Sequence, residues 1–438
     1  MSLYDELRRK HGSFIYHSYE FTEQDGSTLL RFHFSIDEYH FYPRWTFPEE
    51  FSGLTFDREL ADRIAFSLGM AELVSYWKCA CPPVVEIRCG GLSEEQKLWW
   101  KKLYFNGLGE FFYRNGITPG FDSFMTINAP EPSELPARTN SLSGFMVPIG
   151  GGKDSVVTLE LLRKAGVDIS AYIINPRGAT LGCAEAAGIP ESRVIAPKRA
   201  IDKQLLELNK MGYLNGHTPF SAELCACVHG LKYIALSNES SANESYVDGT
   251  QINHQYSKST EFERDFREYC EKWFGGYSRC PEYFSLLRPW SEWQIAREFV
   301  KYPQYFGIFQ SCNLGSKTNS WCCNCAKCLY VYILLAAFLD DDLTRIFGCN
   351  MLEKQELSDM LDGLALDGED KPFECVGTKD EVRLSLEMAW ERRKSDPPAL
   401  LKRWRSLFPE YAPVSLENYF DRDNFVPEEF KYLLGEMQ

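Results

Sequence analysis

Three consecutive glycines are followed by lysine, aspartate and serine at positions 150 to 155 of the chain. A mostly apolar stretch, residues 144–149, precedes them, and an apolar pattern with helical spacing begins at residue 156. Glycine permits tight turns whose backbone N–H groups can lie against an anion, and a following helix adds the positive end of its dipole. This order of strand, loop and helix predicts a phosphate-binding site.

The residue order within this loop excludes two common nucleotide-binding loops. A Walker loop, G-x-x-x-x-G-K-[ST], would need glycine at Val147 and a hydroxyl residue at Asp154. A dinucleotide-binding loop, G-x-G-x-x-G, would need a third glycine at Ser155. The loop instead resembles S-G-G-x-D-S of the PP-loop ATP pyrophosphatases, with Gly150 in place of the first serine. The resemblance implies cleavage of ATP to AMP and pyrophosphate; a glycine-rich turn without a ligand is the alternative.

The composition indicates a folded, acidic protein. A chain of 438 residues is longer than a single hydrophobic core usually supports, so about two or three domains are expected. The net charge of −15 argues against general nucleic-acid binding, so a bound nucleotide needs a local positive pocket. The chain starts without a signal-peptide core, and its longest apolar run, 328–339, is too short to span a bilayer. We therefore expect a cytoplasmic protein that binds neither membranes nor nucleic acid; its oligomeric state is not predicted.

The pattern of strands and helices predicts an α/β protein with three regions. Residues 1–135 combine an antiparallel meander in the first fifty residues with two helical stretches, which indicates an N-terminal α+β domain. Residues 140–350 alternate strand and helix, which predicts a parallel sheet with ligands at the carboxyl ends of its strands. The resemblance of the glycine loop implies that this is a PP-loop domain of the adenine nucleotide alpha hydrolase-like type. Residues 351–438 are charged and mainly helical.

Four cysteines follow the predicted parallel sheet with the spacing C-x9-C-x2-C-x2-C. Tetrahedral zinc binds four thiolates, and a C-x2-C pair supplies two of them from one turn. A closed four-thiolate site leaves no position for water, so this metal would hold the chain rather than catalyse a reaction. An iron–sulfur cluster and reduced buried thiols are the alternatives. The predicted ligands are Cys312, Cys322, Cys325 and Cys328.

Further motifs occur in order along the chain. They are LVSYWK at 73–78, GLGEFFYRNG at 107–116, PIGGGKDS at 148–155, IINPRG at 173–178, LNGHTP at 214–219, NHQYSKSTEFE at 253–263, EYFSLLRPWSEWQIA at 282–296 and KPFECVG at 371–377. With the cysteine cluster, they are similar to those of the UDP-N-acetylmuramoyl-L-alanyl-L-glutamate epimerases, the MurL family of bacterial peptidoglycan synthesis. The resemblance implies that ATP drives conversion of the terminal L-glutamate of a UDP-linked muramoyl dipeptide to D-glutamate, with release of AMP and pyrophosphate.

Adenylation explains why an epimerase would carry a pyrophosphatase loop. An α-proton beside a free carboxylate is hard to remove, because the carbanion would form next to an existing negative charge. Adenylation removes that charge, and the acyl carbonyl can then accept the electrons of the enolate. A base takes the proton from one face and a donor returns one to the other face.

Roles are expected for residues of several motifs. Lys153 would neutralise phosphate charge and Asp154 would lie near the Mg²⁺ that accompanies pyrophosphate. Arg177 and Arg288 are candidates for binding the carboxylates or diphosphate of the substrate. The loop residues expected to bind ATP phosphates are Gly150, Gly151, Gly152 and Ser155, together with Lys153 and Asp154. The candidates for proton transfer, among which the sequence does not decide, are His217, His254, Lys258 and Cys375.

Two other functions fit parts of the same pattern. Enzymes resembling 7-cyano-7-deazaguanine synthase, and RNA-thiolating relatives, also combine a PP-loop domain with a zinc cluster and would activate a different group. The acidic net charge disfavours a tRNA substrate. A non-catalytic ATP-binding protein is the second alternative, because Gly150 replaces the first serine of the loop.

Overall fold

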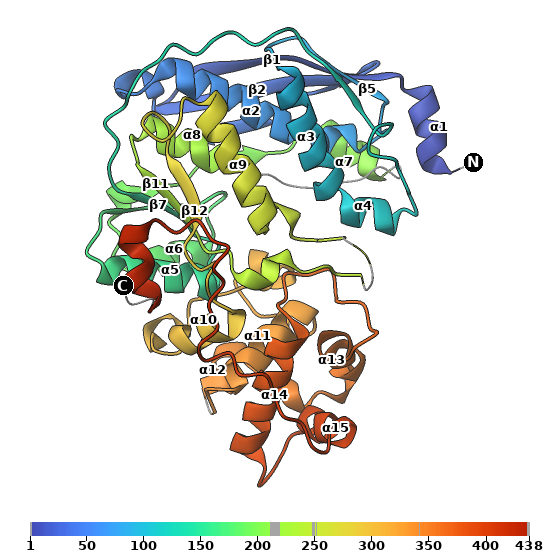
Figure 1. The fold of residues 1–438 in the computed structure, drawn as a ribbon, viewed down its shortest axis with the longest axis vertical. Helices are drawn as coiled ribbons and strands as arrows, with labels where there is room; N and C mark the ends of the chain where they lie inside the picture. Colours follow the sequence, from blue (N-terminus) through green and yellow to red (C-terminus); the bar gives the residue numbers. More distant parts are fainter. Residues whose placement is uncertain (1, 211–219, 248–249, 251, 341, 436–438) are drawn as a thin grey trace. The chain divides into compact units, whose positions relative to one another are not determined.

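The computed structural model describes residues 2–210, 220–247, 250, 252–340 and 342–435. It divides into two compact units that interleave along the sequence (Figure 1). The first unit comprises Met1–Met146, Ile195–Ile234 and Phe262–Tyr283, and the second comprises Val147–Val194, Ala235–Glu261 and Phe284–Gln438. The predicted regions, 1–135, 140–350 and 351–438, instead follow one another along the chain.

The first unit contains a seven-stranded sheet with the order β10-β4-β2-β1-β5-β6, in which β3 also pairs with β2. Strands β1 and β2 form a hairpin closed by Asp25 and Gly26, which both have positive φ as hairpin turns require. The predicted antiparallel meander is thus confirmed. The strands are β1 Ser13–Gln24, β2 Ser27–Ile36, β3 Tyr39–Phe41, β4 Arg44–Phe47, β5 Val84–Ile87, β6 Thr126–Asn128 and β10 Lys198–Ala200.

Helix α2 covers this sheet and contacts β1 and β2. Asp57 caps its N-terminus through the N–H of Leu60, and most of its residues are buried. Gly69 allows the close approach, since a Cβ there would lie 1.9 Å from the hydroxyl of Tyr16. The helices that lie wholly or mainly in this unit are α1 Leu3–Lys10, α2 Arg58–Trp77, α3 Glu94–Gly107, α4 Gly109–Arg114, α7 Lys203–Lys210, α8 Phe220–Val228 and α9 Thr260–Trp273.

A second sheet has five strands in the order β12-β11-β7-β8-β9. Strands β7 and β11 are parallel, with Tyr233 opposite Phe145. From β7 the chain continues through β8 and β9 on one side, whereas β11 and β12 lie on the other, so the strand order reverses between β7 and β11. Open α/β sheets bind ligands at such a switch point. The strands are β7 Phe145–Pro148, β8 Ile169–Tyr172, β9 Val194–Ile195, β11 Tyr233–Leu236 and β12 Glu282–Ser285.

Helices dominate the second unit. Helix α11 is buried along its whole length and packs against α10, α13 and α14, while α10 packs against α5 (Figure 1). The prediction of a mixed α/β protein with parallel strands and a helical C-terminal region is confirmed. The helices are α5 Lys153–Lys164, α6 Gly178–Ala186, α10 Glu292–Phe299, α11 Ala326–Ala336, α12 Asp342–Phe347, α13 Ser358–Ala365, α14 Lys379–Arg393 and α15 Ala399–Leu407.

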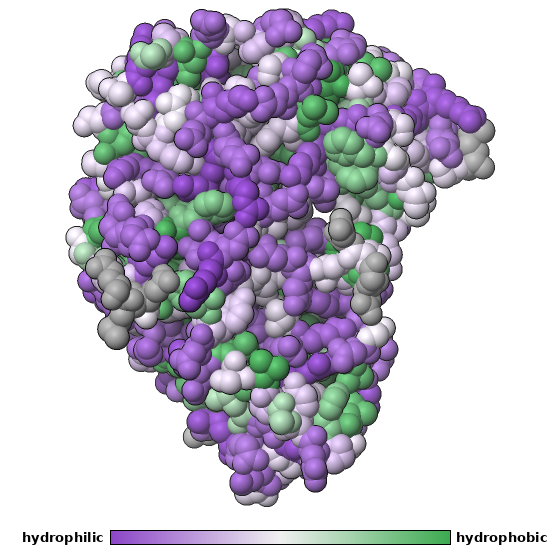
Figure 2. Space-filling model, viewed as in Figure 1, coloured by the Kyte–Doolittle hydropathy of each residue, from purple (hydrophilic) through white to green (hydrophobic). Residues whose placement is uncertain are grey.

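Hydrophobic residues form small, separate groups on the face shown in Figure 2. Among the helices that the structure describes, none is both long and apolar enough to cross a membrane.

Candidate functional site

A pocket of about 350 Å³ lies in the second unit at the switch point of the five-stranded sheet. One wall is the glycine loop that follows β7, and another is the polar segment that follows β11. Its volume lies within the range of small-molecule sites, about 300–1,000 Å³. The lining residues are Pro148, Gly150, Gly152, Asp154, Ser155, Leu236, Ser237, Asn238, Lys258, Gln310, Ser311, Asn313, Lys327 and Cys375.

Two glycines of the loop occupy positions that a larger residue would not fit. Gly151 has a φ of +83°, and a Cβ at Gly152 would lie 2.6 Å from the hydroxyl of Ser311. Helix α5 begins directly afterwards, with Gly152 as its N-cap, and its first N–H groups have no partner within the helix. Ser155 donates its hydroxyl to the carbonyl of Gly152 at 3.0 Å. The loop therefore brings backbone donors and a helix N-terminus to the pocket, as a phosphate site requires.

Lys153 is the first residue of α5; it is buried and is not among the lining residues. Its side chain is only 1% exposed, and its ammonium donates to the carboxylates of Asp154 and of Glu292 on α10. Burial would lower the pKa of Lys153, but these two carboxylates raise it above its usual value, so it is charged. Burial would raise the pKa of Asp154, but Lys153 and Lys327 lower it. Lys153 therefore fixes an ionised Asp154 at the pocket, and the lining ammonium groups belong to Lys258 and Lys327.

Two lining residues carry buried polar atoms without a partner. These atoms are the hydroxyl of Ser237 and the side-chain oxygen of Gln310. A buried polar atom without a hydrogen bond is costly, on the order of 1–3 kcal/mol, so such atoms in a pocket indicate a polar ligand. With the glycine loop and two ammonium groups, these donors and acceptors suit a polar, anionic ligand.

Cys375 and Lys258 meet in this pocket. The Nζ of Lys258 donates to the Sγ of Cys375 at 3.3 Å and to the Oε1 of Gln255 at 3.1 Å. His254 also hydrogen-bonds the thiol, and Lys327 donates to the backbone carbonyl of Cys375. Burial would raise the pKa of Cys375, but Lys258, the hydrogen bond from His254 and the charge of Lys327 lower it to about 6. The group is therefore a thiolate near neutral pH.

The other predicted site residues lie in different places. Arg288 is fully buried and donates to the carbonyls of Glu239 and Lys258, so it supports the segment that carries Lys258. Arg177 is exposed at the start of α6 and is not among the lining residues. His217 lies outside the described residues.

Sequence reasoning missed Glu292 and Lys327. Glu292 is buried at the first position of α10, where burial and the charge of Asp154 raise its pKa to about 8 although Lys153 lowers it. Lys327 lies between two cysteines of the predicted metal site. The sequence offered two signals for these residues. Glu292 is an acidic residue within the motif at 282–296, and Lys327 lies between two predicted metal ligands.

The four predicted cysteines converge in the second unit. All their Sγ atoms lie within 4.8 Å of one another, so the group could hold a metal ion. Cys325 is the N-cap of α11, and its sulfur accepts the N–H of Cys328 at 3.5 Å. Cys312 accepts the N–H of Gly315 at 3.2 Å. The additional thiol, Cys323, instead donates to the carbonyl of Phe347 at 3.1 Å. Four cysteine sulfurs this close together suit a tetrahedral metal site in which all four ligands are thiolates.

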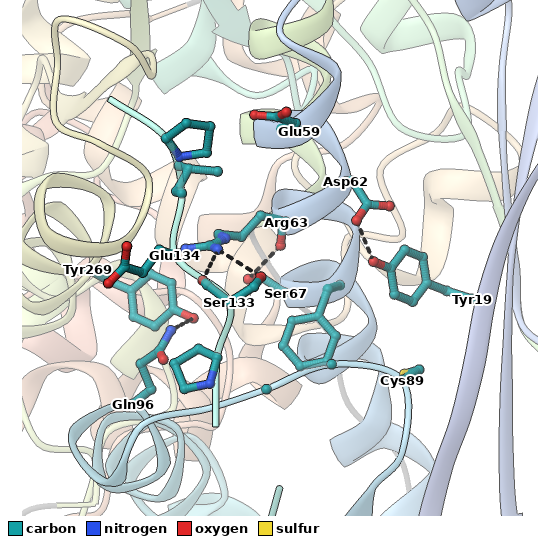
Figure 3. A pocket seen from close by; sticks show the side chains of 16 residues that line it. Tyr19, Glu59, Asp62, Arg63, Ser67, Cys89, Gln96, Ser133, Glu134 and Tyr269 are labelled. Atoms are coloured by element: carbon teal, nitrogen blue, oxygen red, sulfur yellow. Dashed lines mark hydrogen bonds between the residues drawn. The ribbon is translucent and has the colours of Figure 1, made fainter. Parts of the chain in front are cut away.

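A second pocket, of about 380 Å³, lies in the first unit (Figure 3). Three carboxylates line it, those of Glu59, Asp62 and Glu134. Its one lining arginine, Arg63, donates to the backbone carbonyls of Ser133 and Trp273. The excess of negative charge would repel a polyphosphate. Of the two pockets, the glycine-loop pocket therefore has the residues better suited to an anionic ligand.

These features define a mixed α/β protein with a glycine-rich loop at a sheet switch point and a cysteine cluster that could hold a metal. The chain matches the family model of the MurL N-terminal domain over residues 6–286 and that of the MurL C-terminal domain over residues 308–418. It belongs to the MurL family.

Relatives with the name UDP-N-acetyl-alpha-D-muramoyl-L-alanyl-L-glutamate epimerase cover most of the chain. The protein from Xanthomonas oryzae pv. oryzae is 36% identical over 366 residues, which cover 78% of each chain. The protein from Salinispora tropica is 32% identical over 419 residues, 89% of this chain and 87% of the relative. The protein from a Micromonospora species is 33% identical over 355 residues, 77% of each chain. No solved structure matches the chain. The chain is thus a member of an epimerase family.

Proposed function

We propose that this chain uses ATP to epimerise the terminal L-glutamate of UDP-N-acetylmuramoyl-L-Ala-L-Glu to D-glutamate through an acyl-adenylate, with release of AMP and pyrophosphate. The names of its relatives support the epimerase class and this substrate. The observation that carries the adenylation step is the pocket in which a PP-loop-like glycine loop, Asp154 and two lysines meet beside a thiolate.

The residues of the pocket have complementary tasks in this reaction. The loop glycines and the N-terminus of α5 bind phosphate oxygens through backbone N–H groups. Lys258 and Lys327 supply positive charge within a chain whose net charge is −15. Asp154 is the residue that would hold Mg²⁺, which neutralises charge on the pyrophosphate leaving group. Loss of the carboxylate charge through adenylation then lowers the barrier to α-proton removal.

The proposal is tested by incubating the purified protein with Mg²⁺, ATP and the UDP-linked L-Ala-L-Glu substrate in D₂O. We expect AMP, pyrophosphate and a D-glutamyl product with deuterium at the glutamate α-carbon, detected by NMR and mass spectrometry. Formation of AMP without inversion would indicate a different carboxylate activation. ATP binding without AMP formation, across a panel of carboxylates, would indicate a binding protein. Either result would contradict the proposal.

A further inference from the structure

We infer that the thiolate of Cys375, positioned by the ammonium of Lys258, transfers the glutamate α-proton on one face of the substrate. This inference rests on the proposed function and goes beyond it, because it assigns the group that contacts the reacting carbon. Cys375 lines the same pocket as the glycine loop, and its sulfur lies 3.3 Å from the Nζ of Lys258. Arg288 donates a hydrogen bond to the backbone carbonyl of Lys258 and so holds this lysine in place.

The surroundings of Cys375 suit a reversible proton carrier. The groups that face it are Lys258, His254 and Lys327, with Tyr246 nearby. Lys327 is held in turn, since its backbone N–H donates to the carboxylate of Glu374 at 2.9 Å. The sulfur is thus fixed among positive or hydrogen-bonding groups that stabilise its ionised form.

The step balances without a further reactant. The Cα–H bond breaks, its proton forms an S–H bond with Cys375, and the electron pair moves to the carbonyl oxygen of the activated acyl group as an enolate. Protonation of Cα from the opposite face gives the inverted centre. In the reverse direction, the thiol of Cys375 returns its proton to Cα.

Separate assays of the two half-reactions test this role. Cys375→Ala should retain ATP–pyrophosphate exchange, which reports adenylation, within about threefold, but lose deuterium incorporation at Cα by about 10²–10⁴-fold. Cys89→Ser, which removes a thiol in the other unit, should change neither rate. Unchanged deuterium incorporation, or equal loss of both reactions in a variant with wild-type melting temperature, would overturn the inference. No exchange in the wild type would instead defeat the proposed adenylation.

The pH profile of alkylation provides an independent test. The pKa of Cys375 is lowered, so its thiolate forms as the pH rises through about 6, and iodoacetamide labelling followed by peptide mass spectrometry should be half-maximal there. Cys89 is an internal control, because burial raises its pKa to about 12. Lys258→Gln should move the midpoint for Cys375 upward by at least about one unit. An unchanged midpoint would show that Lys258 does not position the thiolate.

A separate observation concerns three histidines on neighbouring strands of the first unit. His17 lies on β1, His33 on β2 and His40 on β3, and a nitrogen of each ring lies within 4.8 Å of the others. His17 falls at a break in the register between β1 and β2, a feature that re-aims side chains. The ring of His17 stacks on that of His33 at 4.3 Å, and His33 Nε2 lies 2.8 Å from His40 Nδ1.

We propose that these imidazoles bind a divalent transition-metal ion such as Zn²⁺. Three histidines are a full protein ligand set for zinc with one open position, and they are chemically distinct from the four-thiolate cluster. The half-buried rings of His17 and His33 limit competition from solvent, while exposed His40 leaves the ion a path of entry. Such an ion would cross-link three strands.

Zinc titration of full-length protein whose cysteine cluster is already loaded tests this site. Isothermal calorimetry should show one further equivalent, and His33→Ala and His40→Ala should each weaken its binding at least about tenfold. His229→Ala is the control, because that histidine pairs with Glu49 elsewhere in the unit. Absence of the additional equivalent, or an affinity in both variants equal to that of the wild type, would refute the site.

Discussion

Replacing Lys153 with methionine is expected to destabilise the protein by about 3–5 kcal/mol, the usual cost of breaking a buried ion pair from one side. The ammonium is 1% exposed and bridges Asp154 and Glu292, so its loss leaves two carboxylates near one another without their cation. Because the same contact fixes the glycine loop against α10, AMP formation should fall as well. The measurements are urea unfolding and AMP release.

A double variant separates charge from packing. Adding Glu292→Gln to Lys153→Met removes one of the two buried acidic groups left behind, whose pKa is already raised to about 8, and it should restore part of the lost stability. Lys394→Met is the control, since Lys394 forms an exposed pair with Glu391 at the end of α14 and should contribute little. If Lys153→Met costs less than about 1 kcal/mol, the ion pair does not hold the loop.

Replacing Cys325 with serine is also expected to have a large effect. The variant should lose bound metal, stability and activity together. Cys325 is both a predicted zinc ligand and the N-cap of α11, the helix that carries Lys327 into the pocket. Gln310, Ser311 and Asn313 line the same pocket beside Cys312. A loosened cluster therefore disturbs two walls of the site.

Metal analysis, thermal unfolding and AMP release check this expectation. We expect about one equivalent of zinc less than in the wild type and a melting temperature lower by more than about 5 °C. Cys323→Ser is the matched control, because the neighbouring thiol lies outside the cluster and bonds the carbonyl of Phe347. A variant at Cys325 that keeps the full zinc content of the wild type would contradict the four-cysteine assignment.

The features that could be predicted from the sequence depend on residues that are close together in the chain. The hairpin at Asp25 and Gly26, and the strand–loop–helix at 145–164, follow from residue types that are adjacent in the chain. The close spacing of three cysteines was likewise sufficient to indicate their convergence. The second of the two helical stretches expected within residues 1–135 is instead two helices, α3 and α4, that meet near Leu108. Gly107 and Gly109 flank this break, so the local sequence carried a signal for it.

Long-range packing explains what could not be predicted. Lys153 was expected to face phosphate, but it is buried against Glu292, which is 139 residues away. Cys375 and Lys258 are separated by 117 residues, so each alone was one candidate among several for proton transfer. The division into two interleaved units could not be predicted for the same reason. Each unit is built from segments that lie far apart in the sequence.

The residues that line the pocket are spread along the chain from Pro148 to Cys375, and this has a consequence during synthesis of the protein on the ribosome. The glycine loop leaves the ribosome long before the segment that contains Cys375, and Lys258 also emerges without its sulfur partner. An unfinished or truncated chain can therefore carry the nucleotide loop without the complete set of reactive groups. The proton transfer inferred for Cys375 therefore requires that the last wall of the pocket has been synthesised and folded, so incomplete copies of the protein lack this step.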